Sequence, residues 1–420
     1  MEKRAAAIIA ERLRRVLELF RIRTYNTIAE AGLQRLSEKL FEVGPDVERP
    51  DALLLRSHKL DVDSIPDSVL AVARAGAGYN NIPVEALTER GVVVFNTPGA
   101  NANAVAELVQ GALLIQVRNL LAGMRYSTDE LQDVDDSQEL NRRMEAEKKR
   151  FRGEELNGRT LCVIGLGSIG SRVAHAGVHF GMNVIGYDPW ISVEAAWMLS
   201  SQVEQSESLR SLAERADFVS VHVPAVAATQ HLINAEFLAW MRPHARLLNF
   251  SRAEVVDADA VVAALESDSL GGYSCDFPTP ALIRRARECG DVHLFPHLGA
   301  STREAEINCS EMAARQLSQF LRFGHVVNSV NFPRALTRTQ GASRLVIFNR
   351  NISGMLGRIT DVLTRRGVNV VNMNNKSRSD VAITLIDSQT PMDEELMNEV
   401  RSIDGVLGGR LIQTDSLESS

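Results

Sequence analysis

Short apolar runs alternate with amphipathic stretches between residues 50 and 118. The runs DALLLRS, VLAVARAG and GVVVFNTPG have the length and residue types of strands, and IPVEALTERG, between the second and third, has the spacing of a helix. Strands that alternate with helices are typical of a parallel α/β sheet. A long apolar helix is predicted next, over NAVAELVQGALLIQVRNLLAGM, followed by an acidic segment at 127–151 that is predicted as exposed helix and loop.

The same alternation restarts at Thr160. Five apolar runs, TLCVIGLG, MNVIGYD, DFVSVHVP, ARLLNFS and LGGYSCDF, predict five strands separated by helices, and a further helix is predicted from Thr302. From about Ser343 the pattern is strand, helix, strand, strand, helix, strand, which is the ferredoxin-like order. The predicted boundaries are a helical extension at 1–20, a first domain at 21–105 that resumes at 298–332, a second domain at 106–297, a linker at 333–342 and a terminal domain at 343–414.

Composition and charge place the chain among soluble globular proteins with several domains. Its 420 residues are 45% hydrophobic and 24% charged. The formal net charge of −7 gives no basic field for nucleic acid or an anionic membrane surface, so an anionic ligand must be bound by local arginines. We therefore expect a small-molecule substrate and neither a nucleic acid nor a membrane as partner.

The four cysteines, Cys162, Cys275, Cys289 and Cys309, are far apart and form no CxxC pair. This spacing argues against a structural zinc site and against a disulfide-linked secreted domain, and reduced thiols favour the cytoplasm. No apolar run reaches the ~18–20 residues of a membrane span. Charges interrupt the N-terminal segment, which predicts an amphipathic helix rather than a secretory signal, and its acidic residues count against organelle targeting.

A glycine motif follows the strand predicted at Thr160. Gly165, Gly167 and Gly170 form GxGxxG between a buried strand and a helix. The first glycine permits a tight turn, the second admits a pyrophosphate close to the backbone, and the third lets helix and strand pack. Asp188 ends the next strand, where a carboxylate accepts hydrogen bonds from ribose hydroxyls and repels a 2′-phosphate. The pattern predicts a dinucleotide site and favours NAD over NADP, while FAD or another nucleotide stays open on these residues alone.

Two polar residues follow later strands, where doubly wound sheets bind their ligands. Arg252 comes directly after the strand and serine of LLNFSR, and a guanidinium there can bind a carboxylate with two hydrogen bonds and polarise an adjacent carbonyl. His297 stands in LFPHLGAST, and histidine is suited to proton exchange with an alcohol near neutral pH. With a hydride acceptor, these two side chains are what the oxidation of a 2-hydroxy acid needs. A surface arginine at a turn and a core histidine are the alternative, purely structural interpretations.

The motifs GLGSIG, YDP, HVP, NFSR, DFP and PHLGAST occur in the order and spacing of D-2-hydroxyacid dehydrogenases, and the chain resembles that family. The segments LLLRS and RAGAGYNNIPVEALTERGVVVFNTPGAN, with the terminal unit, make it similar to the family's phosphoglycerate dehydrogenase branch from about Arg21 to the C-terminus. The resemblance implies an α/β fold with a flavodoxin-like substrate domain, a Rossmann NAD-binding domain and a ferredoxin-like ACT domain. It also implies NAD-dependent oxidation of 3-phospho-D-glycerate to 3-phosphooxypyruvate, the first step of L-serine biosynthesis.

The family's residue roles carry over by motif position. The resemblance makes Arg252 the residue that orients the substrate carboxylate and His297 the acid/base. It assigns Arg56 and Arg74 to the substrate phosphate and carboxylate, with Asn101 bordering the same site. Besides the three glycines of the motif, the positions that match cofactor-lining residues are Ala77, Ser168, Ile169, Asp188, Val223, Pro224, Phe250, Ser251, Asp276, Gly299 and Ala300.

One motif departs from the family pattern. Most members carry a glutamate in a DVFxxEP segment, and this glutamate pairs with the catalytic histidine and fixes its tautomer. Here the segment reads DFPTP, two residues shorter, with Thr279 before the proline and no glutamate. Asp276, or a carboxylate of another loop such as Glu304, is left as a candidate partner, and a weaker or differently pH-tuned enzyme is the alternative.

The terminal unit resembles ACT domains, which pair across subunits and bind amino acids. In serine-inhibited relatives the effector meets a histidine and asparagines; Asn351 and Asn369 match the asparagines, and Asn349 stands in place of the histidine. L-Serine is therefore a candidate effector, beside a domain that only joins subunits, and a homodimer or homotetramer is expected.

Two other functions are weighed against this one. The same chemistry on another 2-hydroxy acid, such as 2-hydroxyglutarate, is disfavoured because a small neutral group would not need both Arg56 and Arg74. An NAD-sensing corepressor shares the dehydrogenase scaffold but lacks a terminal amino-acid-binding module.

Overall fold

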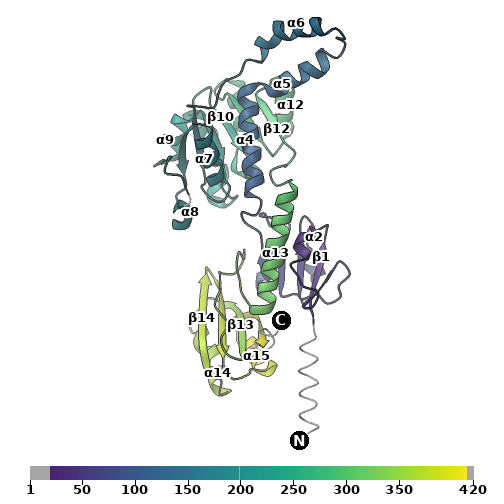
Figure 1. Ribbon diagram of the computed structural model, residues 1–420. Coiled ribbons are helices and arrows are strands. Elements are labelled where there is room, and N and C mark those ends of the chain that lie inside the picture. The colour runs from purple at the N-terminus through teal and green to yellow at the C-terminus, as the bar shows by residue number, and fades with distance from the viewer. Residues whose placement is uncertain (1–18, 198, 414–420) are drawn as a thin grey trace. The chain divides into compact units, whose positions relative to one another are not determined.

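The computed structural model describes residues 19–197 and 199–413 (Figure 1). They form two compact units: the first contains the residues up to Asn101 and those from Glu306 onward, and the second is Ala102–Ala305. The helical extension predicted at 1–20 lies almost entirely outside the described residues.

The first unit contains a five-stranded sheet in which all neighbouring strands are parallel. Its order, β2-β1-β3-β4-β5, confirms the predicted flavodoxin-like arrangement. The strands are β1 (Phe20–Tyr25), β2 (Phe41–Gly44), β3 (Ala52–Leu55), β4 (Ala71–Arg74) and β5 (Val93–Phe95). The helices are α2 (Glu30–Leu33), α3 (Val84–Glu89) and α13 (Arg303–Phe323), which enters the unit at Glu306. All four residues of β3 are buried, as a strand covered on both faces requires.

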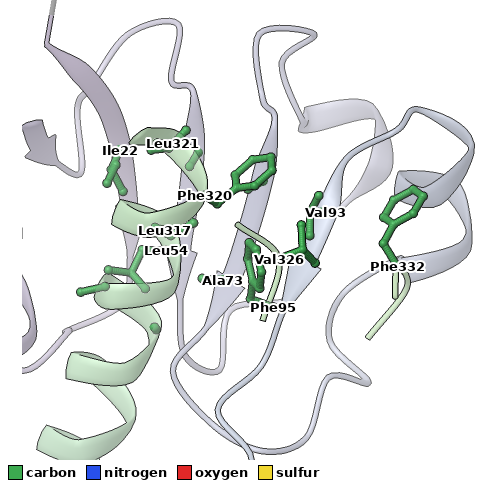
Figure 2. Packing of buried hydrophobic residues seen from close by; sticks show 14 of the residues in the cluster. Ile22, Leu54, Ala73, Val93, Phe95, Leu317, Phe320, Leu321, Val326 and Phe332 are labelled. Carbon is green, nitrogen blue, oxygen red and sulfur yellow. The ribbon is translucent and has the colours of Figure 1, made fainter. Parts of the chain in front are cut away.

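Helix α13 covers one face of this sheet (Figure 2). Its Phe320 and Leu321 belong to one apolar cluster with Ile22, Leu54 and Phe95 of the strands, and the Phe95 and Phe320 ring centroids are 5.8 Å apart. The opposite face of the sheet forms a separate cluster with α3. The sheet is therefore packed on both faces, which fixes the positions of its strand ends.

The residues from Ser343 form an antiparallel sheet of order β14-β15-β13-β16, which confirms the predicted β-α-β-β-α-β chain order. Leu345 and Ile347 of β13 cluster with the two helices, whereas Val346 and Phe348 join the α13 cluster, where the Phe348 and Phe332 rings are 4.6 Å apart. The strand thus buries both of its faces. The elements are β13 (Ser343–Arg350), α14 (Met355–Arg365), β14 (Val370–Arg378), β15 (Val381–Ser388), α15 (Glu394–Arg401) and β16 (Val406–Gln413).

The second unit contains a parallel sheet of order β12-β11-β10-β9-β6-β7-β8, which confirms the predicted Rossmann arrangement. The strands are β6 (Thr160–Ile164), β7 (Asn183–Tyr187), β8 (Val203–Gln205), β9 (Phe218–Val221), β10 (Arg246–Asn249), β11 (Gly272–Cys275) and β12 (Val292–Leu294). The helices are α4 (Ala102–Arg118), α5 (Leu120–Arg125), α6 (Ser137–Glu147), α7 (Gly170–His179), α8 (Val193–Trp197), α9 (Leu209–Arg215), α10 (Ala235–Trp240), α11 (Ala258–Glu266) and α12 (Pro280–Glu288). The chain order turns back between β6 and β9, and such a reversal is where doubly wound sheets bind nucleotides.

The long helix predicted after residue 102 is shorter than expected. It ends at Arg118 because Asn119 adopts a left-handed conformation (φ 48°), and α5 then starts in a new direction. The acidic segment forms α6, which has no buried residue and stands away from the sheet (Figure 1). Among the described helices none alone is long and apolar enough to cross a membrane; α4 and Leu120–Glu130 pass that test only as a pair bent by 73°, by length and composition.

Candidate active site

The glycine turn lies between β6 and α7. Gly165 has a φ of +88°, and a Cβ on it would lie 2.6 Å from the carbonyl oxygen of His222, so only glycine fits there. A Cβ on Gly170 would lie 1.8 Å from the carbonyl oxygen of Gly165. Apart from the glycine itself and its chain neighbours, no described atom comes within 4 Å of a Cβ built on Gly167. Neighbouring protein atoms therefore leave no room for a side chain at the first and third glycines. The second glycine faces open space, where a pyrophosphate would approach.

Asp188 follows β7 directly, beside the glycine turn. Its Oδ2 accepts a hydrogen bond from the Leu166 N–H (2.8 Å), and its Oδ1 accepts one from the Trp190 N–H (3.0 Å). Ser168 is exposed on the turn, and Ile169 precedes the first residue of α7. A fixed carboxylate, an open glycine and a helix N-terminus fit the ribose and pyrophosphate of NAD.

The other predicted cofactor residues of the second unit lie along the same carboxyl edge of the sheet. Val223 and Pro224 follow β9, and the buried Phe250 and Ser251 follow β10. The Phe250 ring lies 5.5 Å from the Phe295 ring, which connects the loop after β10 to the loop after β12.

Arg252 is positioned by a residue that sequence reasoning did not select. Asn249, the last residue of β10, accepts hydrogen bonds from the N–H and the hydroxyl of Ser251 at 3.1 and 2.9 Å. Its amide also donates to the carbonyl oxygen of Arg252 (2.8 Å), and the Arg252 Nη1 donates to the carbonyl oxygen of Ser251 (2.6 Å). A buried asparagine that ends an apolar strand was the available signal, because buried polar side chains are normally hydrogen-bonded.

His297 is exposed and lies in the loop after β12, with a φ of +56° that is uncommon for a residue other than glycine. Its ring meets the Phe277 ring edge-on, with centroids 5.4 Å apart. Among the described residues, none forms a hydrogen bond or ion pair with the imidazole. The acid/base predicted from the sequence therefore has an accessible side chain and no carboxylate partner in this part of the chain.

Asp276 holds the His297 loop rather than the imidazole. The residue is only 2% exposed; its Oδ1 accepts a hydrogen bond from the Leu298 N–H (2.9 Å) and its Oδ2 accepts one from the Gly299 N–H (2.7 Å). Buried Gly299 and half-buried Ala300 continue the same loop. Asp276 follows β11, which lies between β10 and β12, so the three residues lie in the loops after three adjacent strands. Neighbouring strands of a sheet are about 4.8 Å apart.

Thr279 occupies the position where the family pattern has glutamate, and here it begins a helix. Its hydroxyl oxygen accepts a hydrogen bond from the Leu282 N–H (3.3 Å), and Pro280 is the first residue of α12. Threonine as N-cap followed by proline is a preferred helix start. The other candidate carboxylate belongs to Glu304, which is an exposed residue of α13.

Two predicted substrate residues stand at neighbouring strand ends of the first unit. Arg56 follows β3, and Arg74 ends β4 and donates its Nε–H to the carbonyl oxygen of Arg56 (3.0 Å). The Arg56 Nη2 lies 2.7 Å from Oε1 of Glu306, and the two side chains are 40% and 42% exposed. Sequence reasoning missed this pairing. Burial raises the pKa of the nearby Cys309 thiol, against the charges of Arg74 and Arg56.

Ala77 and Asn101 belong to the same unit. The carbonyl oxygen of Ala77 accepts a hydrogen bond from the Asn96 amide (2.6 Å), which fixes the loop after β4. The Oδ1 of Asn101 is buried and has no partner among the described residues.

His222 follows β9, and its backbone packs against Gly165 of the glycine turn. Its Nδ1 is shielded from solvent without a partner in the described part of the chain, and its Nε2 lies 2.8 Å from the Ser220 hydroxyl. Burial lowers the pKa of His222 to about 3, so the side chain is neutral near pH 7. It is a structural support of the turn rather than a proton donor.

The candidate effector residues differ in exposure. Asn349 is 2% exposed, donates to the carbonyl oxygen of Arg350 (2.7 Å) and accepts from the Thr384 hydroxyl (3.4 Å). Asn351 is exposed and donates to the carbonyl oxygen of Ser379 (3.0 Å), and Asn369 is exposed.

A doubly wound sheet with this glycine turn defines a dinucleotide-binding protein of the Rossmann class. Residues 121–299 match the family model described as D-isomer specific 2-hydroxyacid dehydrogenase, NAD binding domain, which confirms the predicted NAD-binding domain. The D-3-phosphoglycerate dehydrogenase of Methanocaldococcus jannaschii is 34% identical over 80% of this chain and 61% of its own length. That of Haemophilus influenzae is 30% identical over 82% of this chain and 81% of its own length.

The solved structures agree. The NAD⁺-bound 3-phosphoglycerate dehydrogenase of Entamoeba histolytica is 26% identical, with a TM-score of 0.58, over 75% of this chain and 99% of that one. The chain thus belongs to the D-isomer specific 2-hydroxyacid dehydrogenase family, with D-3-phosphoglycerate dehydrogenases among its relatives. It spans only about three fifths of the Methanocaldococcus jannaschii relative.

Proposed function

We propose that this protein catalyses the NAD-dependent oxidation of 3-phospho-D-glycerate to 3-phosphooxypyruvate, the first step of L-serine biosynthesis. The observation that carries the proposal is the placement of Arg252, Asp276 and His297 after three adjacent strands of the sheet that also bears the glycine turn. Membership of the dehydrogenase family and the phosphoglycerate dehydrogenases among its relatives support it.

Each residue has a defined task in this reaction. NAD, when bound, supplies the acceptor for the hydride that leaves C2 of the substrate. The imidazole of His297 takes the proton of the C2 hydroxyl, while the guanidinium of Arg252 binds the carboxylate and polarises the forming carbonyl. Arg56 and Arg74 would bind the phosphate and further orient the carboxylate. No carboxylate among residues 19–197 and 199–413 pairs with His297, so its orientation depends on the backbone of its loop and on Phe277.

A second candidate is the same chemistry on an unphosphorylated 2-hydroxy acid. The observation in its favour is the carboxylate of Glu306, which already pairs with Arg56. Turnover of 3-phosphooxypyruvate (also called 3-phosphohydroxypyruvate) and of hydroxypyruvate with NADH separates the two candidate functions, because these substrates differ only in the phosphate group. The first proposal expects the higher kcat/KM for the phosphorylated substrate, and the reverse order would favour the second.

We also propose that the terminal domain acts as an ACT domain that binds L-serine through Asn351 and Asn369. The exposure of both side chains supports this, whereas burial of Asn349 limits its part to fixing the strand. Inhibition by L-serine that is lost in Asn351→Ala is the expected result. If L-serine does not inhibit the wild type and light scattering shows a dimer or tetramer, the terminal domain only joins subunits and is not an effector site.

A further inference from the structure

Arg56 has a fixed backbone at the end of β3. Its carbonyl oxygen accepts hydrogen bonds from the Arg74 Nε–H (3.0 Å) and from the Asn81 amide (3.3 Å). These bonds set the point from which the Arg56 side chain extends. The direction of its guanidinium is then decided by the nearest anion.

That anion is Glu306. The Arg56 Nη2 and the Glu306 Oε1 are 2.7 Å apart, within ion-pair distance. Glu306 lies in the first turn of α13, where the helix dipole favours a carboxylate. Both side chains remain about two fifths exposed, so the pair is accessible to a dissolved anion and weak enough to be replaced by one.

A phosphate group at Arg56 must compete with this carboxylate. A phosphate monoester carries about −1.5 to −2 charges near neutral pH and is repelled by a neighbouring glutamate. A substrate without that group brings only its singly charged carboxylate to the two arginines, so Glu306 repels it less. An exposed arginine already paired with an anion therefore offers a phosphorylated ligand less than an unpaired arginine would.

We propose that Glu306 is a specificity-determining residue: its carboxylate occupies Arg56 and reduces the preference of the site for phosphorylated over unphosphorylated 2-hydroxy and 2-oxo acids. The inference rests on the proposed function, because it uses Arg56 as a substrate-binding residue. It adds that this chain accepts unphosphorylated 2-oxo acids more readily than a site with an uncharged residue at position 306.

The same helix provides a matched control. Glu311, five residues further along α13, pairs with Arg35 at 3.0 Å, and these side chains are 26% and 55% exposed. Arg35 lies just after α2 and not at a strand end. Glu311→Gln therefore makes the same chemical change in the same helix without altering the charge at Arg56.

The test compares full-length wild type, Glu306→Gln and Glu311→Gln. The ratio of kcat/KM for 3-phosphohydroxypyruvate to that for hydroxypyruvate should rise about tenfold in Glu306→Gln, through a lower KM for the phosphorylated substrate. The ratio should stay at the wild-type value in Glu311→Gln. An unchanged or lower ratio in Glu306→Gln, or an equal rise in both variants, would overturn the inference.

Calorimetric binding of 3-phosphoglycerate and D-glycerate keeps this result separate from the proposed function. The ratio of the two dissociation constants should shift toward 3-phosphoglycerate in Glu306→Gln by about the same factor, whether or not turnover occurs. If the wild type binds both ligands but turns over neither 2-oxo acid, the proposed function fails and the binding ratio alone decides the inference. If it binds neither, both fail.

Discussion

Replacing Asp276 by asparagine should loosen the loop that carries His297. The carboxylate accepts one N–H on each oxygen, from Leu298 at 2.9 Å and from Gly299 at 2.7 Å, and the residue is 2% exposed. Asparagine has nearly the same shape but only one oxygen, so one of the two amides would face an NH₂ group. A buried donor without an acceptor costs about 1–3 kcal/mol.

That cost should appear first as loop opening. Hydrogen exchange of the Leu298 and Gly299 amides should be faster by roughly five- to a hundredfold in Asp276→Asn. Turnover should fall by about tenfold or more, because a displaced His297 no longer meets the substrate hydroxyl at hydrogen-bond distance. Mass spectrometry of peptides that cover the loop, together with steady-state kcat, measures both quantities.

Asp257→Asn is the matched control in the same unit. Asp257 caps α11 by accepting from the N–H groups of Asp259 and Ala260, and asparagine is an equally good N-cap. The control should therefore leave exchange in the His297 loop and kcat unchanged. If Asp276→Asn also leaves both unchanged, Asp276 does not hold the catalytic loop and the reasoning is wrong.

Three further changes test other parts of the structure. Gly167→Ala should leave thermal stability unchanged, because no described atom beyond the chain neighbours lies within 4 Å of the added Cβ. It should weaken NAD binding, measured by fluorescence titration, about tenfold or more, and unaltered binding would contradict an open second glycine. His222 has a pKa near 3 when folded and 6.5 as its ordinary value, so stability is full above 6.5 and declines as the pH falls toward 3. His222→Gln should remove about 2 kcal/mol of the loss between about pH 7 and pH 5 in urea unfolding, and an identical pH profile would refute the assignment. The side chains of Arg344 and Asp387 form an ion pair at 2.6 Å and are 0% and 1% exposed, so Arg344→Leu leaves the buried Asp387 carboxylate without its cationic partner. The change should cost about 3–5 kcal/mol of unfolding free energy. The double variant with Asp387→Leu should recover much of this loss, and failure to recover it would contradict a buried-charge penalty.

The three sheets could be predicted because their strands are continuous apolar runs. Continuous runs such as ALLL in β3 and LVIF in β13 indicate burial on both faces. Strands β1, β2 and β8 were not identified, because they are short or contain charged residues. The helix break at Asn119 also escaped prediction, since asparagine tolerates both helical and left-handed conformations.

The candidate site could be predicted at the level of strand ends and glycines. Gly165 and Gly170 indicated a tight turn in which no side chain fits. Arg252 and His297 could be selected because each follows a predicted strand. The pairing of Arg56 with Glu306 could not be predicted, because it joins residues far apart in the sequence. The hydrogen bonds of Asp276 depend on the backbone of a neighbouring loop in the same way.

In the proposed NAD-dependent oxidation, His297 takes the proton of the substrate hydroxyl. The most direct measurement is the formation of NADH from NAD and 3-phospho-D-glycerate by wild type and His297→Ala, with NAD binding measured on both. We expect turnover by the wild type and a loss of about a hundredfold or more in His297→Ala at unchanged NAD affinity. Equal turnover by both proteins, or a wild type that binds NAD but oxidises neither this substrate nor another 2-hydroxy acid, would contradict this expectation.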